Sequence, residues 1–179
     1  LAGLPSLPPE IGIVWTGPEV VSPTITRAEL EETRARLGGR KLLLYDNFPV
    51  NDNGPDDAMA LILGALRGRE AGIRDVVAAY LACPERPLAA SRLSLLTTAE
   101  FLKDPATYDP DAAAARAVAR LAGRNPQAGK ALETQQLEWG GFAGSLNYWP
   151  RDDANPELAA NRLNDPAFVE SFTWTVERY

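Results

Sequence analysis

The chain has 179 residues, a common size for one domain, and 45% of them are hydrophobic, which is enough for a buried core. Its net charge of −6 and its lack of a basic cluster argue against nucleic acid as a partner, because phosphate backbones bind to clustered basic faces. With no histidine and one cysteine, the chain can form neither a Ser-His-Asp triad, nor a His-based zinc site, nor an internal disulfide. No apolar run reaches the ~18 residues of a membrane span, so we expect no membrane partner either.

Three short apolar runs, each followed by turn-forming residues, predict buried strands. They cover residues 11–15, 41–45 and 75–81. Residues 46–55, which follow the second run, contain too many turn formers for the interior of a strand or helix. We therefore expect polar loops directly after the strands.

Helical patterns separate these strands. Thr26 and Glu29 have the spacing of a capping box, which predicts a helix from Thr26 to about Leu37 before the Gly38-Gly39 stop. A short helix is predicted near residues 57–66, and an Ala- and Leu-rich helix over residues 87–101. Strands that alternate with helices in this way favour a parallel sheet with helices packed outside it.

The character of the sequence changes after Lys103. Asp109 and Pro110 cap and start an alanine-rich helix that should reach about Leu121, and a further helix is predicted over residues 126–138. An aromatic, glycine-containing loop follows at residues 139–150. Two short helices are then predicted to begin at Pro156 and Pro166.

The fold class is therefore α/β. Apolar strands with polar residues at their carboxyl ends are typical of a (β/α)8 TIM barrel, but such a barrel takes about 250 residues. We interpret residues 1–103 as the last strands and helices of a barrel and residues 104–179 as a mostly helical extension, which could form an oligomer or partner surface. A partial barrel exposes unpaired sheet edges, so we expect a partner or a missing N-terminal half of the barrel.

Three sequence strings resemble a known family. They are residues 15–22 (WTGPEVVS), residues 45–52 (YDNFPVND) and residues 81–84 (LACP), in this order. Similar strings end the late barrel strands of glycoside hydrolase family 84, the O-GlcNAcase and bacterial hyaluronidase-type β-N-acetylglucosaminidases. The resemblance extends over about residues 10 to 110.

The resemblance implies a retaining, substrate-assisted hydrolysis of terminal β-linked GlcNAc, on protein Ser/Thr or in a related glycoside, with no cofactor. In this reaction two adjacent aspartates assist the sugar's own acetamido group. The family carries that pair upstream of the string that matches residues 15–22, so we expect this chain to lack it. The alternative is a non-catalytic GlcNAc-binding or interaction protein on a degenerate barrel.

The resemblance also implies sugar-binding residues. Asp52 matches a carboxylate that binds two sugar hydroxyls, and Asn47 matches an asparagine of the same pocket. Tyr45 stands where the family usually has tryptophan, and it either forms an apolar pocket wall or packs in the core. Val20 either lines the approach to the pocket or is a buried loop valine.

Two features depart from the pattern. Cys83 replaces the asparagine that contacts a sugar hydroxyl in the family, and it is either a weak sugar contact or a small buried apolar residue. Asp56 and Asp57 look like the aspartate pair but follow the wrong string, and we interpret Asp57 as a helix cap.

Overall fold

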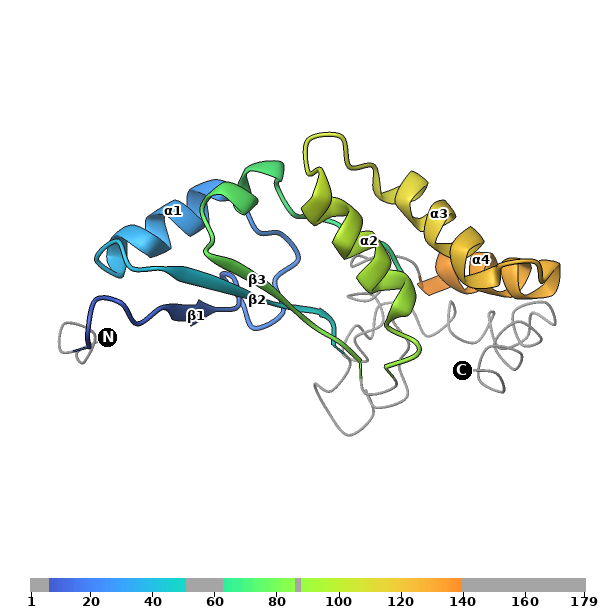
Figure 1. Ribbon diagram of the computed structural model, residues 1–179, viewed down its shortest axis with the longest axis horizontal. Coiled ribbons are helices and arrows are strands. Elements are labelled where there is room, and N and C mark those ends of the chain that lie inside the picture. The colour runs from blue at the N-terminus through green and yellow to red at the C-terminus, as the bar shows by residue number, and fades with distance from the viewer. Residues whose placement is uncertain (1–6, 51–62, 86–87, 140–179) are drawn as a thin grey trace, which may run out of the picture.

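The computed structural model describes residues 7–50, 63–85 and 88–139, with side chains described up to residue 133. Its centre is a parallel sheet of three strands in the order β1-β2-β3 (Figure 1). These are β1 (Ile13–Trp15), β2 (Leu42–Pro49) and β3 (Ala79–Cys83). The register pairs Val14 with Leu43 and Tyr45 with Leu81, so the carboxyl ends of the three strands lie at the same edge of the sheet.

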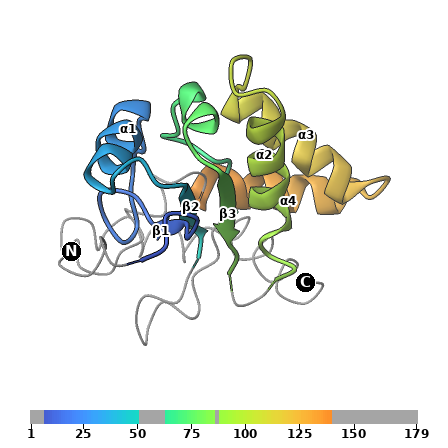
Figure 2. The ribbon, with the colours of Figure 1, turned by 60° about the vertical axis from the view of Figure 1, so that its left-hand side comes forward.

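Helices cover one face of this sheet. The helix α1 (Arg27–Arg36) connects β1 to β2, the 3-10 helix η3 (Ala71–Asp75) precedes β3, and α2 (Arg92–Lys103) follows it. All three lie on the same side of the strands (Figures 1 and 2). The α1 helix begins at the expected capping box, in which Thr26 Oγ1 accepts from Glu29 N and Glu29 Oε2 accepts from Thr26 N.

The two faces of the sheet differ in burial because alternate residues of a strand point to opposite sides. In β2, residues 42, 44, 46 and 48 are buried against the helices, whereas residues 43, 45 and 47 are only half-buried. On this second face, Val14 is 58% exposed and Leu81 is 40% exposed. The apolar core on the helix-covered face consists of Ile25, Leu30, Leu37, Leu42, Leu44, Phe48, Leu66, Ile73, Val76 and Phe101.

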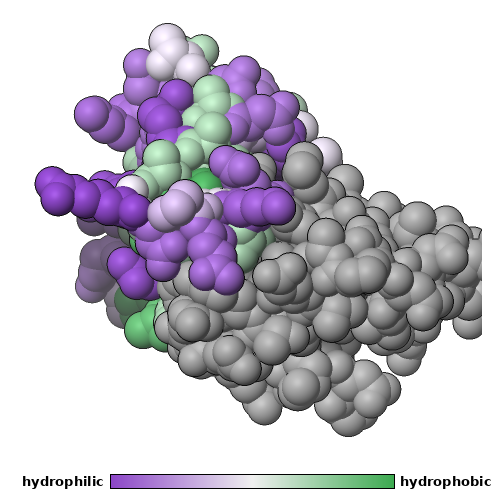
Figure 3. Space-filling view, turned by 90° about the vertical axis from the view of Figure 1, so that its right-hand side faces the viewer, coloured by the Kyte–Doolittle hydropathy of each residue, from purple (hydrophilic) through white to green (hydrophobic). Residues whose placement is uncertain are grey.

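Two more helices continue the fold beyond α2 and away from the sheet. They are α3 (Pro110–Ala122), whose N-cap Asp109 accepts from Ala112 N, and α4 (Pro126–Trp139). The α3 helix packs on α2, and α4 packs on α3. Seen from the side of α3 and α4, most of the described surface is hydrophilic (Figure 3). None of the described helices has both the length and the apolar character of a membrane span. The side chains that join α2, α3 and α4 are Leu93, Ala117, Val118 and Leu132.

The α/β class, the parallel strands and most of the helices expected from the sequence are confirmed, with differences in their bounds. The second strand continues to Pro49, where a break in register lets a proline end the ladder. Residues 63–66 are not helical. The third strand begins at Ala79 because residues 71–75 form η3, and α2 begins at Arg92 rather than at residue 87. The remainder of the helix expected near residues 57–66, the aromatic loop from residue 140 on, and the helices expected from Pro156 and Pro166 lie outside the described residues.

Candidate functional site

Four of the five residues singled out in the sequence lie at the carboxyl-terminal edge of the sheet. Tyr45 and Asn47 are two residues apart in β2, so both point to the face that the helices leave open. Val20 follows β1, and Cys83 ends β3. In parallel sheets with helices outside, this edge is where ligand sites are found.

Asn47 joins β2 to the loop that follows β1. Its side-chain Nδ2 donates to the backbone carbonyl of Val20 at 2.6 Å. Hydrogen bonds of the buried Ser22 side chain stabilise this loop. Its Oγ accepts from Glu19 N at 3.1 Å and donates to the carbonyl of Glu19 at 3.0 Å. The Val20 side chain is 69% exposed, so it is not the buried loop valine of the second interpretation. Asn47 therefore holds the loop in place while Val20 faces outward beside it.

Tyr45 and Cys83 meet across β2 and β3. The Tyr45 hydroxyl lies 3.2 Å from Cys83 Sγ, within hydrogen-bonding distance for sulfur, and both residues are half-buried. Tyr45 and Cys83, at both of which the resemblance implies a different residue, are therefore in direct contact. A tyrosine hydroxyl here also occupies one weak hydrogen-bonding site of the thiol.

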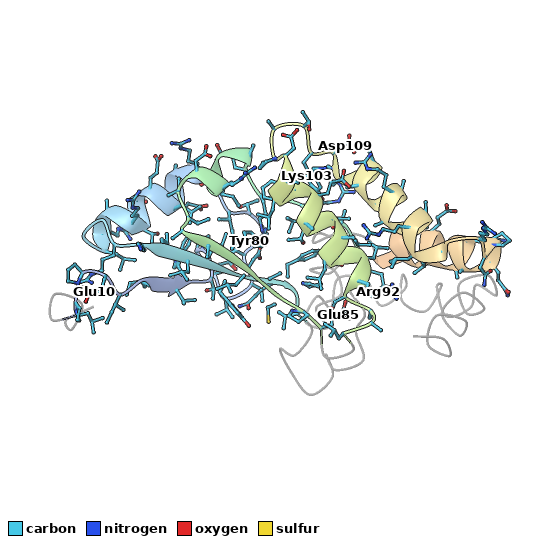
Figure 4. All side chains as sticks on the ribbon, viewed as in Figure 1. Glu10, Tyr80, Glu85, Arg92, Lys103 and Asp109 are labelled. Carbon is cyan, nitrogen blue, oxygen red and sulfur yellow. The ribbon has the colours of Figure 1, made fainter. Side chains whose placement is uncertain are left out.

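A buried polar cluster lies on the opposite face of the same strand. Asp46, between Tyr45 and Asn47, accepts two hydrogen bonds from Arg69, from Nε at 2.7 Å and from Nη2 at 2.6 Å. Both of these side chains are 1% exposed. The Tyr80 hydroxyl donates to Asp46 Oδ2 from β3, and Figure 4 shows Tyr80 near the middle of the molecule. The cluster thus joins β2, β3 and the chain before η3.

Burial and charge shift the pKa values of Arg69 and Tyr80. Burial alone lowers the pKa of Arg69, but the hydrogen bonds and negative charge of Asp46 outweigh it and raise that pKa, so the guanidinium stays charged. Burial and then Asp46 hold the pKa of Tyr80 well above 10.0. Burial also raises the pKa of Tyr108 to about 12, and its hydroxyl donates to the carbonyl of Leu66 at 2.8 Å.

The raised tyrosine pKa values predict alkaline destabilisation. Above about pH 10, tyrosines of the unfolded chain lose protons that Tyr80 and Tyr108 keep in the fold. Stability from these groups is complete below about pH 10 and falls as pH rises toward 12. We expect the free energy of unfolding in urea to decrease between about pH 10 and 12, and less so in a Tyr108→Phe variant. Equal decreases in both proteins would contradict the assignment to Tyr108.

Gly68 allows the close contact that brings Arg69 to the cluster. Its φ is 71°, and a Cβ there would lie 2.1 Å from the Pro23 carbonyl oxygen. We expect Gly68→Ala to cost about 2–3 kcal/mol in urea unfolding, from backbone strain and overpacking together. Gly38→Ala is the matched control, since its φ of 70° is similar but nothing lies within 4 Å of the added carbon. It should cost only about 1 kcal/mol, and equal losses would show that the contact with Pro23 is unimportant.

Asp52 and the adjacent pair Asp56-Asp57 lie outside the described residues. The residues that sequence reasoning missed are Asp46, Arg69 and Tyr80. The sequence contains a signal for Asp46. Every second residue around it, including Leu44 and Phe48, is apolar, so Asp46 falls on the buried side of the strand and needs a buried partner.

The described edge of the sheet can supply hydrogen bonds and an aromatic wall. An amide, a phenol and a thiol are suited to a neutral, hydroxyl-rich ligand such as a sugar. Within the described ranges, no group of three or more Cys, Asp or Glu side chains could hold a metal ion, and the sequence has no histidine. No two adjacent carboxylates stand at the end of a described strand.

Comparison with known proteins gives a consistent result. The sequence model of the NAGidase family, described as beta-N-acetylglucosaminidase, matches residues 4–136. A mutant of the O-GlcNAc hydrolase of Thermobaculum terrenum is similar in structure, with a TM-score of 0.68 and 32% identity over 75% of this chain. The protein CpGH84B has the same fold over 75% of this chain, with a TM-score of 0.63 and 24% identity. The chain spans only 28% and 22% of the lengths of these two proteins.

Proposed function

Because the chain belongs to the β-N-acetylglucosaminidase (NAGidase) family, we propose that it is the sugar-binding part of a β-N-acetylglucosaminidase of the glycoside hydrolase family 84 type. The parent protein removes terminal β-linked GlcNAc from a modified protein or a related glycoside. In this proposal the three strands belong to a TIM barrel whose other strands come from the N-terminal half of the parent protein.

The observation that carries the proposal is the meeting of Tyr45, Asn47, Val20 and Cys83 at the carboxyl-terminal edge of the sheet. They come from three segments of the chain that are far apart in sequence, and they lie beside the open face, where Leu81 and Val14 are also exposed. A sugar at this edge would meet the Asn47 amide and the Tyr45 side chain, which offers an aromatic ring and a hydroxyl. In the proposed pocket, Asp52 adds a carboxylate that accepts from two sugar hydroxyls.

The proposed reaction is retaining and substrate-assisted, so the acetamido oxygen of GlcNAc attacks the anomeric carbon while an aspartate pair assists it. We place that pair in the N-terminal half of the barrel, because the family carries it upstream of the string that matches residues 15–22. The residues of this chain bind and orient the sugar. Asn47 keeps the Val20 loop at a fixed position beside the sugar, and Tyr45 excludes water from one side of it.

The test compares the 179-residue chain with its complete parent protein. We expect the chain alone to bind methyl β-N-acetylglucosaminide in a titration but not to hydrolyse a fluorogenic β-GlcNAc glycoside, which the parent protein hydrolyses. A chain that binds no GlcNAc would contradict the assignment of the site. Hydrolysis by the chain alone would contradict the proposal that this chain binds the sugar while another part of the protein carries the catalytic pair. Asp56 and Asp57 would then become the first candidates for that pair.

A specific observation favours a second candidate, a non-catalytic GlcNAc-binding protein. The family's usual asparagine is replaced by Cys83, and its thiol is engaged by the Tyr45 hydroxyl rather than presented alone to a ligand. A site that binds sugar without stabilising a transition state tolerates the loss of one hydroxyl contact. The two candidates differ in one measurement, since only the first predicts turnover by the parent protein.

The departure at Cys83 gives a further prediction. Restoring the family residue with Cys83→Asn adds an amide that can donate to and accept from a sugar hydroxyl. We expect GlcNAc to bind about 3–10-fold more tightly, the value of one net hydrogen bond. The control is Cys83→Ala, which also loses the contact with Tyr45 but gains no hydrogen-bonding group. If both variants bind alike, this position does not contact the sugar.

A further inference from the structure

The buried cluster of Asp46, Arg69 and Tyr80 lies directly behind the candidate site. Asp46 separates Tyr45 from Asn47 along β2, and its side chain points to the helix-covered face while theirs point to the open face. Any change in the position of the Asp46 backbone therefore moves both neighbouring side chains. No part of the proposed sugar contact uses the cluster itself.

Arg69 binds more than its ion-pair partner. While Nε and Nη2 bind the carboxylate of Asp46, Nη1 donates to the carbonyl of Pro23 at 3.1 Å and to that of Arg67 at 3.2 Å. Pro23 belongs to the connection between β1 and α1, three residues after Val20. One guanidinium group thus fixes the distance between β2 and the chain that leaves the Val20 loop.

A second contact crosses the same gap on the open face, where Asn47 donates to the Val20 carbonyl. The loop is therefore held to β2 twice, by Asn47 in front and by Arg69 behind. The front contact is half-exposed, whereas the rear contact is buried and charged, and a charge-assisted fork has the stricter geometry. We propose that Arg69, Asp46 and Tyr80 are positioning residues that set the place of Asn47 and the Val20 loop for sugar binding, an inference that rests on the proposed function.

Stability alone does not account for the cluster. Buried ion pairs can often be replaced by apolar side chains of similar size without loss of stability, because the pair must also be desolvated. Apolar side chains cannot, however, hold the carbonyls of Pro23 and Arg67. A positioning role therefore predicts that stability and site geometry respond differently to the same substitution.

The experiment uses the double variant Asp46→Leu with Arg69→Met, the milder variant Tyr80→Phe, and the control Arg116→Ala, which removes an exposed ion pair with Glu100. Folding is followed by urea unfolding, and affinity by titration with methyl β-N-acetylglucosaminide. The Asn47 side-chain amide signals in NMR report its hydrogen bond to the Val20 carbonyl independently of sugar. In the double variant we expect folding to persist, the Asn47 amide protons to exchange about tenfold faster, and affinity to fall about tenfold.

The outcomes distinguish a positioning role of the cluster from a purely stabilising one. A folded double variant with the wild-type Asn47 signals and affinity would overturn the proposal. If the double variant does not fold, Tyr80→Phe decides, with about threefold faster exchange expected and unchanged exchange contradicting it. If the wild-type chain binds no sugar, the proposed function fails, while the Asn47 signals still test the positioning role. The control should leave exchange and affinity at wild-type values.

Discussion

Arg69→Ala will destabilise the protein by about 3–5 kcal/mol, because it removes one partner of a buried ion pair and leaves the other charge uncompensated. Of its partners in the described part of the chain, the Asp46 carboxylate would keep the Tyr80 hydroxyl, and the carbonyls of Pro23 and Arg67 would each lose a donor. A carboxylate that is 1% exposed cannot regain water without opening the fold. Urea unfolding of wild type and variant at neutral pH measures the difference.

The exposed ion pair between Arg116 and Glu100 provides the comparison. The same truncation, Arg116→Ala, should cost no more than about 1 kcal/mol, since both partners are solvated and the pair is screened. If the two variants lose similar amounts of unfolding free energy, water reaches Asp46 and the cluster is not protected from solvent. A large loss for Arg69→Ala that Asp46→Leu with Arg69→Met restores would locate the cost in the unpaired charge.

The local elements were predictable where the signal lies within a few residues. The capping box of Thr26 and Glu29 and the cap at Asp109 mark helix starts by short-range hydrogen bonds, and both are present in the structure. The strand that ends at Pro49 was predicted too short, because Asp46 and Asn47 have low strand propensity. Their conformation depends on Arg69 and on the Val20 loop, which are distant in sequence.

The sequence singles out the candidate residues but does not predict their contacts. Family strings identified Tyr45, Asn47, Val20 and Cys83, and the alternation of β2 explains why Tyr45 and Asn47 share a face. The contact between Tyr45 and Cys83 depends on the register of two parallel strands, which no local pattern encodes. The partner of Asp46 could not be chosen among the arginines of the chain for the same reason.

Asp52→Ala in the complete parent protein should lower kcat/KM for a β-GlcNAc glycoside by about 10²–10⁴-fold. In the proposed pocket this carboxylate accepts from two sugar hydroxyls, and hydrogen bonds to charged groups contribute about 1.5–3 kcal/mol each. Such contacts far from the reacting carbon also orient the sugar, so kcat should fall as well as affinity. Hydrolysis of a fluorogenic glycoside over a range of concentrations separates the two effects.

Asp57→Ala supplies the matched control, because it removes the same side chain only five positions further along the chain. As a helix cap it should cost about 1 kcal/mol of stability and leave kcat/KM near the wild-type value. Near-normal turnover by Asp52→Ala would remove that residue from the site. Loss of turnover by Asp57→Ala in a folded protein would instead assign catalysis to the Asp56-Asp57 pair, and the chemistry would then belong to this chain rather than to the proposed N-terminal half of a barrel.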